Sequence, residues 1–130
     1  MGHPDLIEGL ERVKNSFNSY PLGRLAQAGA TAAIRDQAHL EENSAKVVKT
    51  RTKLVKDLDD LGFITLPSTA NFIFTRHPKH AGVKLYHALR DQGIVVRHFK
   101  LPRIEDFLRI TIGTDEQSSE LIVALKTILI

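Results

Sequence analysis

We predict an α/β fold, α+β in the finer classification, in which helices flank a small antiparallel or mixed sheet. The first half of the chain has the hydrophobic spacing of helices, and the second half alternates short apolar runs with helical segments. Gly62 marks the change between the two patterns. A length of 130 residues, of which 42% are hydrophobic and 25% charged, suits about one globular domain.

Three helices are predicted in the N-terminal half. In the first, apolar residues recur at helical spacing after Pro4, at Leu6, Ile7, Leu10, Val13 and Phe17. The turn formers of residues 15–21 predict a loop, and the alanine-rich residues 22–35 predict a second helix. Residues 37–61 predict a long polar helix with one apolar stripe, which suits a connector, and Gly62 is its expected C-cap.

A β-β-α-β-β-α order is predicted after Gly62. The first five elements are expected at residues 63–66, 71–76, 81–92, 94–99 and 107–112. Thr114 and Gln117 then stand three residues apart as in a capping box, in which each side chain satisfies the backbone N–H of the other residue. The last helix is therefore expected to begin just after Thr114.

Composition excludes several classes of protein. The net charge is +3 and the charges are interspersed, without the zinc, RNP-type or helix-turn-helix patterns of nucleic-acid binding. Without cysteine, neither a disulfide nor a cysteine-based metal site can form, which is compatible with a reducing cytosol. No apolar stretch approaches 18 residues, and the N-terminus lacks the layout of a signal peptide. We therefore expect a cytoplasmic protein without nucleic-acid or membrane partners.

The histidines predict no metal site, because their spacing does not match a set of metal ligands with the carboxylates. Surface or packing roles are expected for His3, His39, His77, His80, His87 and His98.

An arginine stands in the middle of the last predicted strand. Side chains alternate between the two faces of a strand, so Arg109 shares its face with Phe107 and Thr111. A guanidinium in such apolar surroundings is costly unless it meets an anion, and a carboxylate matches its fork with two parallel hydrogen bonds. The strand alone leaves two alternatives open: an ion pair with a nearby Asp or Glu, or simple exposure to solvent.

A second arginine, Arg97, lies in the strand predicted just before. If the two strands pair, Arg97 and Arg109 face one cleft, and two cations together imply a doubly anionic ligand or neutralising protein carboxylates. Arg76 ends its strand beside His77 and Pro78, and we expect it to be a solvated edge residue.

Asn71 begins the strand that follows the Pro67–Ser68 turn. Its amide can orient a neighbouring arginine or can simply cap the loop, and the residues alone do not decide between these roles.

Several segments, in this order, resemble the histidinol-phosphate aminotransferase family. They are residues 2–7 (GHPDLI), 13–18 (VKNSFN), 70–72 (ANF), 93–97 (GIVVR) and 108–114 (LRITIGT). The resemblance covers essentially the whole chain, and its most specific part is the LRITIGT segment preceded by the Val-Val-Arg strand.

The resemblance implies a fold-type-I enzyme that uses pyridoxal phosphate and works as a homodimer or higher oligomer. Residues 1–36 are then a helical C-terminal remnant of the large cofactor-binding domain, residues 37–61 a connecting helix, and residues 62–130 the small substrate-binding domain. The family's substrate-carboxylate arginine falls on Arg109, and a second substrate-contacting arginine falls on Arg97.

Three further positions carry a role by resemblance. Asn71 matches the asparagine of the family's Ala-Asn-Phe motif and is expected to bind substrate. Asn18 and Tyr20 are expected in a loop near the active site and the dimer interface.

The family's catalytic lysine has no counterpart in this chain. That lysine forms a Schiff base with the cofactor and lies in a Ser-x-x-Lys segment shortly before the Gly-His-Pro stretch, and no Ser-x-x-Lys occurs in the sequence. We therefore expect the chain to be a C-terminal fragment, from truncation or a fragmentary gene, that contains no catalytic residue, binds no cofactor and is inactive alone.

The implied reaction of the parent enzyme is amino-group transfer between an amino acid or a phosphorylated amino alcohol and a 2-oxo acid, 2-oxoglutarate, in histidine biosynthesis. Two alternatives stay open. Threonine-phosphate decarboxylase is similar over this region, and the arginines alone do not separate it from the transaminase. The β-β-α-β-β-α half could also be a free-standing, non-enzymatic ligand-binding module.

Overall fold

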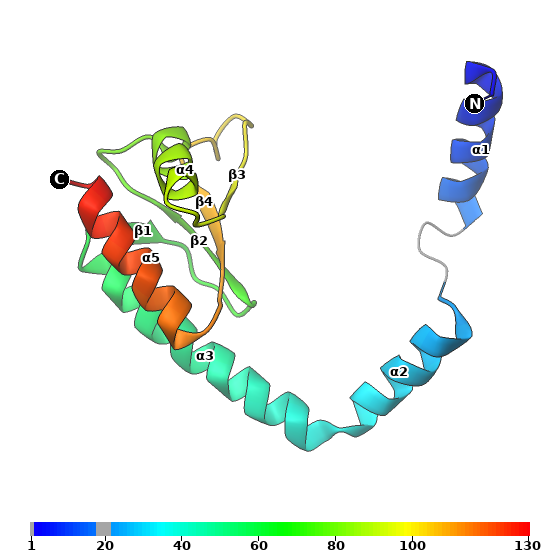
Figure 1. Ribbon diagram of the computed structural model, residues 1–130, viewed down its shortest axis with the longest axis horizontal. Coiled ribbons are helices and arrows are strands. Elements are labelled where there is room, and N and C mark those ends of the chain that lie inside the picture. Colours follow the sequence, from blue (N-terminus) through cyan, green and yellow to red (C-terminus); the bar gives the residue numbers. More distant parts are fainter. Residues whose placement is uncertain (1, 18–21) are drawn as a thin grey trace. The chain divides into compact units, whose positions relative to one another are not determined.

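The computed structural model describes residues 2–17 and 22–130. Their helices and strands are α1 (Pro4–Phe17), α2 (Arg24–Arg35), α3 (Gln37–Asp59), β1 (Ile64–Thr65), β2 (Phe72–Arg76), α4 (Gly82–Asp91), β3 (Arg97–His98), β4 (Leu108–Thr111) and α5 (Asp115–Ile128), as Figure 1 shows. The chain divides into two compact units, one up to Leu40 and one from Glu41 onward. The predicted α/β class, with helices around a small sheet, is confirmed.

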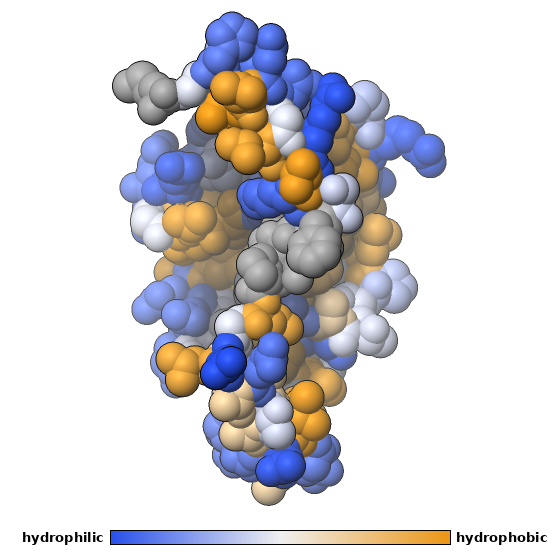
Figure 2. Space-filling model, turned by 90° about the vertical axis from the view of Figure 1, so that its right-hand side faces the viewer, coloured by the Kyte–Doolittle hydropathy of each residue, from blue (hydrophilic) through white to orange (hydrophobic). Residues whose placement is uncertain are grey.

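The N-terminal unit consists of α1, α2 and the first residues of α3. The first predicted helix is confirmed, but it continues to Phe17, so the loop predicted from residue 15 onward is wrong for residues 15–17. Large apolar side chains on these helices are exposed, among them Leu6, Leu10 and Leu25, the last at 90%. Figure 2 shows hydrophobic side chains at the surface beside hydrophilic ones. Helices with an apolar stripe of this kind normally bury it against another part of a protein.

The second unit contains a four-stranded antiparallel sheet of order β1-β2-β4-β3. The last strand of the sequence therefore lies between β2 and β3. In this register Arg109 of β4 stands opposite Phe74 of β2 on one side and opposite Arg97 of β3 on the other. Strand order thus brings together side chains that are far apart along the chain.

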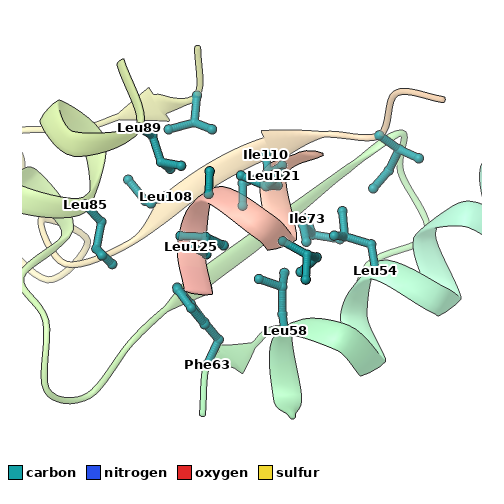
Figure 3. Packing of buried hydrophobic residues seen from close by; sticks show 14 residues of the cluster. Leu54, Leu58, Phe63, Ile73, Leu85, Leu89, Leu108, Ile110, Leu121 and Leu125 are labelled. Atoms are coloured by element: carbon teal, nitrogen blue, oxygen red, sulfur yellow. The ribbon is translucent and has the colours of Figure 1, made fainter. Parts of the chain in front are cut away.

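Helices α3, α4 and α5 supply apolar side chains to a single core on one face of this sheet. Figure 3 shows leucines of the three helices meeting inward-facing residues of β2 and β4. The fully or nearly fully buried apolar residues are Leu54, Leu58, Phe63, Ile73, Leu85, Leu89, Val96, Leu108, Ile110, Ile112, Leu121, Ile122, Ala124 and Leu125. Since all of them lie between residues 54 and 125, the core belongs to the second unit alone.

The predicted helix ends are confirmed. Gly62 and Gly93 have φ angles of +84° and +79°, a conformation that glycine adopts without a Cβ penalty. At the start of α5, the Gln117 N–H donates to the Thr114 hydroxyl, and the Thr114 N–H donates to the Gln117 side-chain oxygen. The Thr50 hydroxyl donates to Asp115 at 2.7 Å, which joins α3 to this same helix start.

The strand predicted for residues 94–99 is much shorter than expected, because only Arg97 and His98 pair with β4. Val96 is nevertheless buried, at 8% exposure, in the core that the helices help to form. Within the apolar run, Val96 therefore packs into the core without pairing in the sheet, whereas Val95 is 80% exposed.

In the described ranges 2–17 and 22–130, none of the helices has the length and apolar character needed to cross a membrane.

Candidate functional site

The two faces of β4 differ in chemistry, as its alternation predicts. Leu108, Ile110 and Ile112 are buried on the helix-covered face. Arg109 is half-buried and Thr111 exposed on the opposite face. We call this second surface the open face; its members are Phe72, Phe74, Arg76, Arg97, Phe99, Phe107, Arg109 and Thr111.

Arg97 and Arg109 are direct cross-strand partners on the open face. The predicted pairing of the two strands is therefore confirmed at these residues, and it puts both side chains on the same face of the sheet. Side chains directly opposite each other in an antiparallel pair have Cβ atoms about 4.5–5.5 Å apart, within reach of a shared ligand. A hollow of about 420 Å³ borders both arginines; its lining is Tyr86, Val95, Val96, Arg97, His98, Arg109 and Thr111.

Each arginine of the open face lies over a phenylalanine ring. The Cζ atom of Arg109 is 5.2 Å from the centroid of the Phe72 ring, and that of Arg97 is 5.1 Å from the Phe99 ring. Both distances are within the range of a cation–π attraction. The rings also touch one another, since Phe74 stacks on Phe107 at 4.6 Å and meets Phe99 edge-on at 6.2 Å. Each arginine of the pair therefore lies over a ring of its own, Arg109 over Phe72 and Arg97 over Phe99.

Arg109 has no acidic partner among the described residues. Its Nε atom is buried and has no hydrogen-bond partner there, and none of the ion pairs described for the chain includes it. The alternative of a structural ion pair to a nearby Asp or Glu is thus not observed in the described parts of the chain. A buried cationic donor without a partner is costly, which makes the site receptive to an anion.

The expectation for Arg76 was wrong. Arg76 is half-buried on an inner strand of the sheet, and its Cζ atom lies 5.7 Å from the Phe107 ring centroid. Arg76 does end β2, where it pairs with Ile64 of β1 and the β4 ladder has already stopped at Thr75, but it is partly covered rather than solvated. Arg76 is consequently a third cation on the open face rather than a solvated edge residue.

Asn71 is not brought to the arginine pair by any interaction described for the chain. Its backbone oxygen accepts from the Ile112 N–H, which extends the β2–β4 ladder by one bond. It is exposed and borders a hollow of about 280 Å³ that α3 residues such as Val47 and Arg51 also line. Arg51 donates to the backbone oxygen of Ala70 at 2.6 Å, so the adjoining loop is tied to α3.

Asn18 and Tyr20 lie outside the described residues. Among the residues that are described, no group of three or more His, Cys, Asp or Glu side chains could hold a metal ion. The sequence analysis missed the rings of Phe72 and Phe99. Their alternation with neighbouring residues places each on a face, but which arginine each ring meets depends on the register between strands.

Comparison with known proteins identifies the family. Residues 1–125 match the family described as aminotransferase class I and II. The chain belongs to this family. It is 57% identical over 129 residues to histidinol-phosphate aminotransferase 2 of Rhizobium meliloti (strain 1021), an alignment covering 99% of this chain and 37% of that protein. The chain thus spans about a third of the length of the curated relatives it matches, and the predicted resemblance is confirmed.

Solved structures of the same family are also similar to this chain. The crystal structure of histidinol-phosphate aminotransferase from Sinorhizobium meliloti in complex with pyridoxal-5'-phosphate superposes with a TM-score of 0.78 at 26% identity, covering 93% of this chain and 34% of that one. The L-threonine-O-3-phosphate decarboxylase of Porphyromonas gingivalis reaches a TM-score of 0.52 at 26% identity over 62% of this chain and 27% of its own. The decarboxylase is thus the weaker likeness of the two.

Proposed function

We propose that this chain is the C-terminal part of a pyridoxal-phosphate-dependent histidinol-phosphate aminotransferase, which passes an amino group from histidinol phosphate to 2-oxoglutarate in histidine biosynthesis. The observation that carries the proposal is the cross-strand pair Arg97 and Arg109, which faces outward without an acidic partner among the described residues. The 57% identity to curated histidinol-phosphate aminotransferases supports this substrate over others.

The chemistry of the pair suits both halves of such a reaction. A phosphate monoester carries about 1.5 to 2 negative charges at neutral pH, and two guanidiniums can share its three acceptor oxygens. In the other half-reaction, a carboxylate of the 2-oxo acid can occupy the fork of Arg109 with two parallel hydrogen bonds. One site then binds two different substrates in turn. Arg109 makes the main contact with each anionic group, and Arg97 adds a second one.

Asn71 contributes to substrate binding in this proposal through the backbone rather than by direct contact. It stands where β2 begins, immediately before Phe72, and its hydrogen bond to Ile112 fixes the end of the β2–β4 ladder. Asn18 and Tyr20 keep their proposed place in an active-site or interface loop.

Pyridoxal phosphate supplies the electron sink for the reaction when it is bound. The open face does not fit that group, because its donor set is guanidiniums and aromatic rings with no ammonium group to bind an aldehyde. We propose that the cofactor's lysine and phosphate ligands belong to the two thirds of the protein that the relatives have and this chain does not span. The 130-residue chain alone is accordingly inactive.

We further propose a cytoplasmic enzyme that assembles as a homodimer or higher oligomer. The exposed apolar side chains of α1 and α2 support this, since such surfaces are normally covered by protein. In light scattering, the 130-residue chain should associate. If the chain stays monomeric at high concentration, the exposed apolar side chains of α1 and α2 do not drive association.

The experiment is a substrate comparison on the complete protein expressed from its whole reading frame. Histidinol phosphate with 2-oxoglutarate should give glutamate at a rate well above that of threonine phosphate, whether the latter is scored as transamination or as carbon dioxide release. The 130-residue chain, measured beside it, should give neither product. Faster decarboxylation of threonine phosphate than transamination of histidinol phosphate would refute the proposed function in favour of the decarboxylase.

A further inference from the structure

The two anion-binding arginines of the open face are held by rings where many proteins use carboxylates. Arg109 is half-buried and Arg97 is exposed. An arginine that binds a ligand needs something to restrain its long side chain, and an acidic residue is the common solution. On the open face no carboxylate occurs among its eight members, and the described ion pairs of the chain lie elsewhere, on exposed helix surfaces. What lies beside each guanidinium is a phenyl ring.

A ring and a carboxylate restrain a guanidinium in different ways. A carboxylate occupies the N–H groups at the edge of the fork, so it competes with an anionic ligand for the same donors. A ring attracts the cation through its π face and takes none of the N–H donors. A guanidinium held by a ring therefore remains free to make a bidentate bond, and its full positive charge remains available to the ligand.

Phe72 is well placed for this task. It is the first residue of β2 and stands opposite Thr111, which is two residues from Arg109 along β4 and on the same face. Its ring is partly exposed to solvent, at 36%, and lies beside the Arg109 guanidinium. The Nε atom of Arg109 is buried and has no hydrogen-bond partner among the described residues, so this donor is not occupied by a protein acceptor there.

We propose that Phe72 is a positioning residue for Arg109, and Phe99 for Arg97, so that the site's affinity and selectivity for anions depend on these rings. The proposal deepens the proposed function and rests on it for the identity of the substrate. Anion binding itself can be measured independently of turnover. The open face also supplies its own control, because Phe107 lies beneath Arg76, a cation to which we assign no ligand.

The first test measures binding of succinate, an unreactive dicarboxylate, to the complete protein by calorimetry. Replacing Phe72 by leucine, which keeps an apolar side chain of similar size, should weaken binding about 3- to 30-fold, the range of a partly desolvated cation–π contact. Phe72→Tyr, which keeps a ring, should bind within about twofold of the unchanged protein. Phe107→Leu should also stay within about twofold.

A second readout separates positioning from general disruption. In nitrogen-15 spectra of the 130-residue chain, Phe72→Leu should shift the Arg109 Nε–H resonance and increase its mobility while the Arg97 resonance stays in place. Phe99→Leu should do the reverse. In steady-state kinetics, Phe72→Leu should raise KM for histidinol phosphate with kcat largely kept, because the lost interaction holds ground state and transition state alike.

Equal weakening of succinate binding by Phe72→Leu and Phe107→Leu, or failure of Phe72→Tyr to restore it, would overturn the inference. The inference would also be overturned if Phe72→Leu left the chemical shift and the mobility of the Arg109 Nε–H group unchanged. Ring-dependent succinate binding in a protein that does not transaminate histidinol phosphate would support the inference and reject only the proposed substrate.

Discussion

The two faces of the sheet show how one strand serves two purposes. On the covered face, β4 presents Leu108 and Ile110 to three helices, and their burial holds the unit together. On the open face, the same strand presents Arg109 between Phe74 and Arg97, and little of that surface is sealed from solvent. Under the proposed function, stability and ligand binding are encoded by alternate residues, so that substitutions one position apart should have effects of different kinds.

The largest expected effect comes from the open face. In the complete protein, Arg109→Ala removes the bidentate charged contact proposed for the substrate and should cost about 2–5 kcal/mol of transition-state binding. Since 1.36 kcal/mol is tenfold in rate, kcat/KM should fall roughly 30- to several-thousand-fold. Steady-state kinetics measures this, and thermal unfolding of the variant should change much less than its activity.

Two companion variants sharpen this prediction. Arg109→Lys should recover only part of the loss, because an ammonium group lacks the planar fork. Arg76→Ala removes the third cation of the same face and should matter far less, because Arg76 ends β2 opposite Ile64 of β1 and does not pair with β4. Equal losses at positions 76 and 109, or full recovery with lysine, would mean that the carboxylate site is misassigned.

The next largest effect comes from the covered face, one residue away. Leu108 is completely buried between the sheet and the helices, so Leu108→Ala leaves a cavity that neighbouring side chains fill only in part. The free energy of unfolding should fall by about 2–5 kcal/mol, measured by urea denaturation of the 130-residue chain. Thr111→Ala, on the open face, is the matched control and should change stability by less than about 0.5 kcal/mol. A similar loss of unfolding free energy at positions 108 and 111 would contradict the view that only the covered face stabilises the unit.

Most of the covered face was predictable and most of the open face was not. Helix spacing predicted α3, α4 and α5, and alternation predicted which side of β4 is buried, because both patterns are local. The contacts of Arg76, Phe72 and Phe99 depend on a sheet order in which β4 inserts between β2 and β3. Such an order is decided by long-range packing, and no local spacing encodes it.

The early end of β3 has a similar cause. Residues 94–96 are apolar enough for a strand, yet only Val96 is buried and none of the three pairs with β4. A run of apolar residues predicts burial, but it does not predict whether a helix or a neighbouring strand buries each residue.

A moderate effect is expected at the helix that closes the covered face. Thr114→Ala removes the hydroxyl that accepts from the Gln117 N–H, and the loss of such a cap costs about 1 kcal/mol. The chain's urea midpoint should drop accordingly, with an unchanged dependence on denaturant. Thr114→Ser keeps the hydroxyl and serves as the control. An alanine variant as stable as the serine variant would show that the Thr50–Asp115 hydrogen bond alone anchors the start of α5.

The smallest expected effect is a change in pH dependence at the rim of the covered face. His77 packs edge-on against the buried Phe63 at 5.1 Å, and its Nδ1 accepts the backbone N–H of Lys79 at 3.1 Å. Burial lowers the pKa of His77 below its ordinary value of 6.5, the nearby His80 and Lys79 lower it further, and a hydrogen bond to the Leu61 backbone partly opposes them. A proton on Nδ1 would also displace the Lys79 N–H.

Because the folded state binds this proton less readily than the unfolded state, the contribution of His77 to stability is complete above pH 6.5 and is lost as the pH falls through the lowered pKa. His77→Gln, which keeps a side-chain hydrogen-bond acceptor but does not titrate, should therefore flatten the decline in stability between about pH 7 and pH 5. Urea denaturation of both proteins across that range measures the slope. His87→Gln is the control, because His87 is exposed and lies on α4, and it should leave the slope unchanged. A His77→Gln variant that loses stability with acid as steeply as the unchanged chain would show that the acid sensitivity lies elsewhere in the unit.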